Sequence, residues 1–151
     1  MKKAIIIYDT KFGNTEKIAS SLAHGMKKQE VKVDCVKVDE VDVDNLVDYD
    51  LLAVGGPTHK AGMSEPMKGF LEELQTVDIS GKKGFCFDTR MHSRFNRFDL
   101  NSAAKRIEKK MKVTMIESRK SAIAEGREGP LENGVQNTFE KLGEEIAKLI
   151  Q

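Results

Sequence analysis

The 151-residue chain has few of the residues that cross-link a protein or bind metals. Its two cysteines, Cys35 and Cys86, are too few for a disulfide framework or a cysteine-rich metal site. Both lie in apolar runs, so we expect reduced thiols in the core. The three histidines do not have the spacing of a zinc site, and no metal is expected. A chain of this length can instead be stabilised by an ordinary hydrophobic core.

Long apolar stretches are also lacking. The first apolar run covers residues 4–8 and ends at Asp9. It is shorter than the ~7–15 apolar residues of a secretory signal. We therefore expect no membrane partner, no secretion and a cytoplasmic location. No repeat, low-complexity tract or linker divides residues 1–151, which predicts a single domain.

Charge is balanced over the whole chain but not along it. The formal net charge is +1, yet residues 82–120 hold 12 lysines and arginines against 4 acidic residues. Residues 39–50 carry six carboxylates and no basic residue. A segment as basic as 82–120 suggests an anionic partner. Since no known nucleic-acid-reading motif accompanies it, nucleic acid is not expected as that partner.

Strand-like and helix-like apolar patterns alternate along the chain. Continuous β-branched runs are typical of buried parallel strands, and apolar residues three and four apart indicate amphipathic helices. Asn14 or Thr15 is the expected cap of the first helix. The predicted strands are residues 4–8, 31–38, 50–55, 83–88 and 113–124, and the predicted helices are residues 14–26, 64–74, 101–112 and 135–149.

This alternation predicts an α/β fold in which a doubly wound sheet of about five parallel strands has helices on both faces. The second strand is more polar than the others and is expected near an edge. Right-handed crossovers leave few topologies, and doubly wound sheets bind ligands beyond the carboxyl ends of their strands. The loops that follow Tyr8, Val54 and Phe87 are therefore the candidate binding loops.

The first of these loops predicts a phosphate site. It combines one glycine with short polar side chains between a buried strand and a helix start. Helix N-termini offer unpaired N–H groups and a partial positive charge, which favour an anion. Neither a G-x-x-x-x-G-K-[ST] loop nor a G-x-G-x-x-G fingerprint is present. The candidate residues are Thr10, Lys11, Phe12, Gly13, Asn14 and Thr15.

Residues 10–16, T-K-F-G-N-T-E, match without a gap the phosphate loop T-x-[FYST]-G-N-T-[ED] of the flavodoxin family, which this chain resembles. Residues 55–58, G-G-P-T, resemble the second flavin loop of that family. Residues 87–90 lie where its third flavin loop follows the fourth strand. The order and spacing of the elements are similar over the whole chain, and no long insertion interrupts the fifth strand. The resemblance is therefore to the short-chain members, and it implies non-covalently bound FMN.

The resemblance also implies where FMN lies. Its phosphate would lie on the first loop, and its ring would lie between the second and third loops. Family members usually sandwich the ring between aromatic side chains, commonly Trp or Tyr, and this chain has no Trp. The stacking positions fall to His59 or Lys60 on one side and to Met91, His92 or Phe95 on the other. The implied ring-site residues are Pro57, Thr58, His59, Lys60, Ala61, Gly62, Asp88, Thr89, Arg90, His92 and Phe95.

The function implied by the resemblance is electron transfer between redox partner proteins. These would be a reductase or low-potential donor and an acceptor, and the basic third-loop region favours partners with an acidic docking face. FMN carries the redox chemistry, so no catalytic side chain is expected. The resemblance specifies neither the identity of the partners nor an oligomeric state.

Two other functions are compatible with a sheet of this kind. An FMN-dependent oxidoreductase could reduce a quinone or oxidise a porphyrinogen, although a chain this small has little room for a substrate pocket beyond the flavin. A flavin-free receiver-type signalling domain needs an acidic pair after the first strand and an aspartate at the end of the third. Asp9 stands alone, and Gly55 and Gly56 replace that aspartate. The electron carrier is the preferred interpretation.

Overall fold

The apolar run near the start of the chain forms strand β1 (Lys3–Tyr8), which lies between two parallel neighbours. These neighbours are β2 (Lys32–Lys37) at the edge of the sheet and β3 (Leu51–Pro57). The side chains of β1 from Ala4 onwards are buried on both faces, as its continuous apolar sequence predicts. The structure is a computed structural model that describes residues 1–58, 63–91, 102–126 and 128–151.

Beyond β3 the sheet continues with β4 (Lys83–Met91), which pairs at its outer side with two short strands. They are β5 (Thr114–Met115) and β6 (Lys120–Ala124), and all strand pairs are parallel. This confirms the doubly wound α/β fold. The single fifth strand expected over 113–124 is instead broken. Met115 pairs with Gly84 and Lys120 with Phe87, so four residues of the outer segment lie opposite only two of β4.

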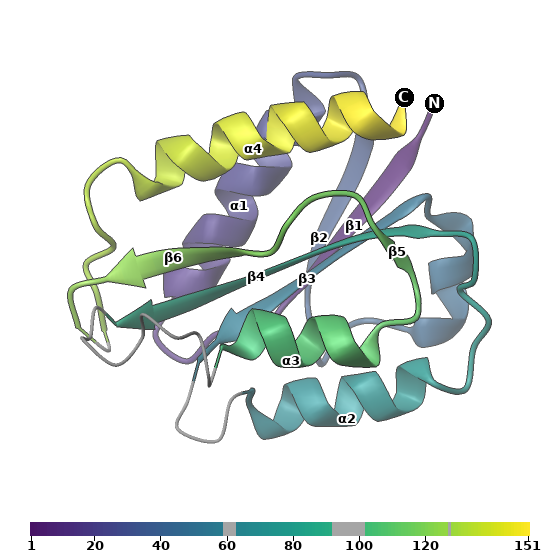
Figure 1. Ribbon diagram of the computed structural model, residues 1–151, viewed down its shortest axis with the longest axis horizontal. Coiled ribbons are helices and arrows are strands. Elements are labelled where there is room, and N and C mark those ends of the chain that lie inside the picture. Colours follow the sequence, from purple (N-terminus) through teal and green to yellow (C-terminus); the bar gives the residue numbers. More distant parts are fainter. Residues whose placement is uncertain (59–62, 92–101, 127) are drawn as a thin grey trace.

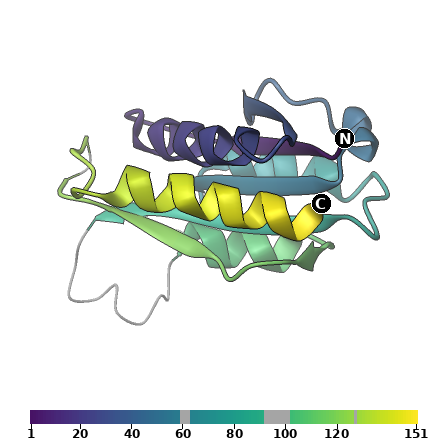
Figure 2. The same cartoon turned by 90° about the horizontal axis from the view of Figure 1, so that it is seen from above.

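Helices cover both faces of this sheet (Figures 1 and 2). α1 (Asn14–Lys27) and α4 (Val135–Ile150) lie on one face, and α2 (Glu65–Leu74) and α3 (Ala103–Lys110) lie on the other. Alternate residues along each strand point to opposite faces of the sheet and pack in two separate hydrophobic cores. Ile6 packs with α1 and α4, whereas Ile5 and Ile7 pack with α2 and α3. A 3₁₀ helix, η1 (Val43–Asp48), lies between β2 and β3.

The start of α1 differs from the expectation that Asn14 or Thr15 would cap it. Its N-cap is Gly13, which has a left-handed φ of 95°, and no described side chain caps the helix. Asn14 and Thr15 are its first two residues. Glycine adopts this conformation without the steric cost that a Cβ brings. The two polar side chains are thus not used by the helix as caps.

Two further expectations about the core need correction. Cys86 is buried as expected, but Cys35 is only half-buried because it lies on the edge strand β2. Burial still raises the pKa of the Cys35 thiol to about 11. Leu149, on the apolar stripe expected for α4, is 53% exposed, and Ile150 is buried in its place.

The two helices on one face pack backbone to backbone. A Cβ added to Gly143 of α4 would lie 2.2 Å from the carbonyl oxygen of Leu22, and one added to Gly25 of α1 would lie 1.9 Å from that of Glu140. Lys28 Nζ lies 2.5 Å from a carboxylate oxygen of Glu140 at the rim of this contact. Glycine is therefore required at both crossing points. None of the helices within the described ranges is long and apolar enough to cross a membrane.

Gly143→Ala is expected to destabilise the protein by about 3 kcal/mol, because the added methyl group overpacks a backbone contact. Gly69→Ala provides the matched control, since Gly69 lies inside α2 with no atom within 4 Å of an added Cβ. There alanine should stabilise the helix by about 0.5–1 kcal/mol. Urea unfolding of both variants measures the two effects. Equal free energies of unfolding would show that α1 and α4 do not pack as described.

Candidate functional site

The loops after β1, β3 and β4 meet at the carboxyl edge of the sheet, where the arrowheads of β3 and β4 lie in Figure 1. In the sheet Tyr8 pairs with Gly55, and Gly55 pairs with Phe87. The Asp9 N–H donates to the carbonyl of Gly55 at 3.1 Å, joining the first two loops. The Thr58 N–H donates to the carbonyl of Thr89 at 2.8 Å, joining the second and third.

The first loop forms an open helix start. The Gly13 N–H donates to Thr10 Oγ1 at 2.9 Å, which holds the loop in a tight turn. Since no described side chain caps α1, the N–H groups of its first turn are left for another acceptor. The helix dipole adds partial positive charge at the same place. The loop can therefore bind an anion with neutral donors alone.

Asn14 and Thr15 are polar residues buried at this helix start, 7% and 1% exposed. Thr15 Oγ1 lies 2.9 Å from Thr89 Oγ1 of β4. A hydroxyl donates one hydrogen bond and accepts two, so a proton donated by Thr89 leaves that of Thr15 for an external acceptor. Asn14 Oδ1 is buried and has no hydrogen-bond partner among the described residues. Buried polar atoms normally have partners, so this one marks a site rather than a core.

Lys11 and Phe12 lie on the outside of the same loop. Both are exposed, and Lys11 Nζ lies 5.5 Å from the centre of the Phe12 ring. At the end of β1, Tyr8 donates to a Glu16 carboxylate oxygen at 3.2 Å. Burial, together with the negative charge of Glu16, raises the pKa of Tyr8 to about 12. Its phenol therefore stays protonated and neutral beside the loop.

The second and third loops hold the start of α3. Thr58 Oγ1 accepts from the Ala103 N–H at 3.0 Å. Asp88 Oδ2 accepts from Ser102 Oγ at 2.5 Å and from the Ala104 N–H at 3.1 Å. Asp88 is fully buried, and its other oxygen, Oδ1, has no hydrogen-bond partner in the described part of the chain. Two residues selected for cofactor contact thus also position a helix.

Sequence reasoning missed a third connection, between the first loop and α2. The hydroxyl of Ser64, the N-cap of α2, donates to Asp9 Oδ2, and the Met67 N–H donates back to Ser64 Oγ at 3.3 Å. The sequence Ser64-Glu65-Pro66 indicated the helix start. No sequence pattern indicated the hydrogen bond between Ser64 and Asp9, because the two residues are 55 positions apart.

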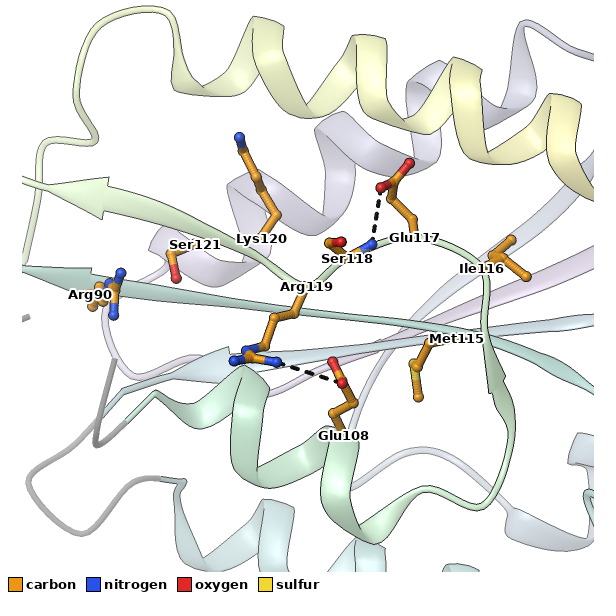
Figure 3. A pocket seen from close by; sticks show the side chains of 9 residues that line it. All are labelled: Arg90, Glu108, Met115, Ile116, Glu117, Ser118, Arg119, Lys120 and Ser121. Carbon is orange, nitrogen blue, oxygen red and sulfur yellow. Dashed lines mark hydrogen bonds and ion pairs between the residues drawn. The ribbon is translucent and has the colours of Figure 1, made fainter. Parts of the chain in front are cut away.

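Arg90 lies on the α3 side of the sheet, on the wall of an open groove of about 840 Å³ (Figure 3). The groove follows the break between β5 and β6. Arg119 Nη1 lies 3.6 Å from Glu108 Oε1 across it, and Ser118 N donates to Glu117 Oε1 at 3.0 Å. Pro57 ends β3 and is half-buried. The remaining ring-site candidates, His59, Lys60, Ala61, Gly62, His92 and Phe95, lie outside the described residues.

Metal ligands do not gather anywhere in residues 1–58, 63–91, 102–126 and 128–151: no three His, Cys, Asp or Glu side chains form a candidate site there. The geometry offers neutral donors for an anion, and it links three loops through buried hydroxyl and carboxylate groups.

Known proteins resemble this chain in sequence and in structure. A family model described as flavodoxin matches residues 6–141. The probable flavodoxin 1 of Bacillus subtilis (strain 168) is 32% identical over 94 residues, covering 62% of this chain and 60% of that protein. The flavodoxin of Synechocystis sp. is 36% identical over 84 residues, covering 55% of this chain and 49% of that protein. These matches thus span about half the length of the curated relatives. A solved flavodoxin structure from the domain Archaea is 25% identical, with a TM-score of 0.80 over 98% of both chains.

Asp88→Ala should cost about 3 kcal/mol of stability, because two buried donors at the start of α3 lose their shared acceptor. Asp78→Ala is the matched control. Asp78 also accepts from a serine hydroxyl and a backbone N–H, both from Ser80, but on the exposed surface. Its loss should cost at most about 1 kcal/mol, since water replaces the acceptor. Urea unfolding compares the two, and similar costs would contradict the role given to burial.

Proposed function

Given that this chain belongs to the flavodoxin family, we propose that residues 1–151 form one FMN-binding domain that carries electrons between redox partner proteins. When bound, FMN supplies the redox chemistry, and the protein supplies binding and orientation. The observation that carries the proposal is the start of α1, where an uncapped helix N-terminus meets the buried Asn14 and Thr15. Two free cysteines fit a reducing compartment, which supports a cytoplasmic location.

Residues 10–15 fit a phosphate group through donors without fixed charge. The first N–H groups of α1 point out of the helix start, as an anion requires. Thr10 Oγ1 accepts from Gly13 and keeps its own proton to donate. Thr15 keeps its proton in the same way when Thr89 donates to it. Asn14 adds an amide that can donate through Nδ2.

The flavin ring is proposed to lie between Pro57–Gly62 on one side and Asp88–Arg90, His92 and Phe95 on the other. The hydrogen bond from the Thr58 N–H to the Thr89 carbonyl supports this placement, because it holds the described ends of the two loops together at the carboxyl edge of the sheet. The bonds of Asp88 to Ser102 and Ala104 keep the third loop anchored on α3. Because FMN supplies the redox chemistry, the proposed carrier needs no reacting side chain.

Apoprotein titrated with FMN, riboflavin and FAD tests the cofactor, and binding should be tightest for FMN. Thr15→Ala should weaken FMN binding by about 10–100-fold, because a hydrogen bond to a charged phosphate is worth about 1.5–3 kcal/mol. Riboflavin, which lacks the phosphate, should bind almost unchanged. Ser21→Ala is the control, since this hydroxyl of α1 makes an exposed bond to the Lys17 carbonyl at 3.0 Å. Equal losses for FMN and riboflavin would rule out the phosphate assignment.

Turnover separates the carrier from an FMN-dependent oxidoreductase. The reconstituted protein should show almost no oxidation of NADH or NADPH with a quinone until a partner reductase is added. Steady turnover without a reductase would favour the enzyme.

The docking face is proposed to be the basic surface formed by α3 and the adjoining β5–β6 segment. Between residues 102 and 120 there are seven lysines and arginines against two glutamates. Those with exposed side chains are Arg106, Lys109, Lys110, Lys112 and Lys120. The start of α3 bonds to Thr58 and Asp88, so this surface begins beside the proposed ring site, and Lys109 and Lys110 lie at the other end of the helix. A partner with an acidic docking face fits it by charge.

Lys109→Gln combined with Lys110→Gln should slow electron transfer to an anionic acceptor. Ferricyanide, a trianion, is the probe, and reoxidation of the reduced protein is followed by stopped flow from 20 to 300 mM salt. The rate at low salt should fall about two- to fivefold and its salt dependence should become shallower, because steering acts within a Debye length of about 10 Å at 0.1 M salt. Lys141→Gln with Lys148→Gln, on α4, is the control pair. Equal salt slopes in both double variants would rule out the α3 surface.

A further inference from the structure

The connection between β6 and α4 ends in a tight turn that reaches the first loop. The Gly129 N–H donates to the Gly126 carbonyl at 3.1 Å. On either side, Glu125 N bonds to Pro130 O at 2.9 Å, and Glu132 N bonds to Ile123 O at 2.9 Å. These antiparallel bonds continue the end of β6, so the turn is held to the sheet. It therefore has a fixed position relative to α1.

Gly129 lies directly against the side chain of Asn14. Its φ is +103°, and a Cβ at this position would lie 3.0 Å from Asn14 Oδ1 and 3.5 Å from Nδ2. Asn14 is only 7% exposed, and its Oδ1 has no hydrogen-bond partner among the described residues. An added Cβ would therefore push the Asn14 amide by a few tenths of an ångström, and the positive φ favours glycine as well.

The orientation of the Asn14 amide matters for the ligand. Phosphate oxygens only accept hydrogen bonds, so the amide can bind phosphate only through Nδ2. In that orientation Oδ1 faces away from the phosphate, and the structure buries Oδ1 against Gly129. The Asn14 amide thus occupies the space that a side chain at position 129 would take.

We infer that Gly129 is a positioning residue for the phosphate site: it leaves the space in which the Asn14 amide lies and so contributes to the preference for FMN over riboflavin. This inference rests on the proposed function. It adds the β6–α4 turn to the site, which neither the sequence motif nor the three loops include. A bulkier residue at 129 displaces the amide and removes its donor from the phosphate.

Gly129→Ala tests this through the ratio of the dissociation constants for FMN and riboflavin. We expect FMN binding to weaken about tenfold, the loss of one charge-assisted hydrogen bond, and riboflavin binding to change less than twofold. Gly81→Ala is the matched control. Its φ is +83°, which imposes similar backbone strain, but no atom lies within 4 Å of an added Cβ. The control should lose stability and leave the ratio unchanged.

A double-mutant cycle shows whether Gly129 acts through Asn14. In an Asn14→Ala background, Gly129→Ala should change FMN affinity less than twofold, because the amide it positions is gone. If the alanine variant does not fold, Gly129→Asn replaces it, since asparagine tolerates a positive φ better. Equal losses for FMN and riboflavin, or additive effects in the cycle, would overturn the inference. A wild-type protein that does not prefer FMN would instead overturn the proposed function, before any variant is measured.

Discussion

Tyr8, the last residue of β1, pairs with Gly55 of β3, and Gly55 pairs with Phe87 of β4, so the carboxyl ends of three parallel strands lie at one edge of the sheet. Everything proposed for the site depends on this pairing. Parallel strands need helical crossovers, which place a helix start after each strand. The register therefore brings the uncapped start of α1 next to the ends of the two other loops, and it places Thr15 opposite Thr89.

Hydrogen bonds link the described ends of these three loops. Thr89 bonds to Thr15 through its hydroxyl and to Thr58 through its carbonyl. Thr58 and Asp88 in turn hold the start of α3. A buried polar group without a partner is costly, so such a network is stable only when its members stay together. Displacement of one of these ends would break the bonds of the others, which suits the carrier function proposed above.

The sequence allowed the order of the strands and helices to be predicted, because short continuous apolar runs and three- and four-residue spacings depend on local burial. It also pointed to residues 10–15, where a glycine and short polar residues adjoin a strand. The break between β5 and β6 could not be predicted, since it arises from four residues lying opposite two of β4. The bond of Ser64 to Asp9 and the contact of Gly129 with Asn14 join distant positions. No periodicity in the chain carries such information.

Neutral hydrogen-bond donors and fixed positive charges lie in different parts of the structure. At the first loop, backbone N–H groups and hydroxyls face the proposed phosphate, and the one lysine of that loop, Lys11, is exposed beside Phe12. Fixed positive charge gathers instead on α3, where Lys109 and Lys110 are exposed. Dipoles act over short distances and select a bound group, whereas net charge acts over about a Debye length and steers a partner. Under the proposed function the two tasks fall to different residues, so substitutions on α3 should change association with a partner while the cofactor site keeps its affinity.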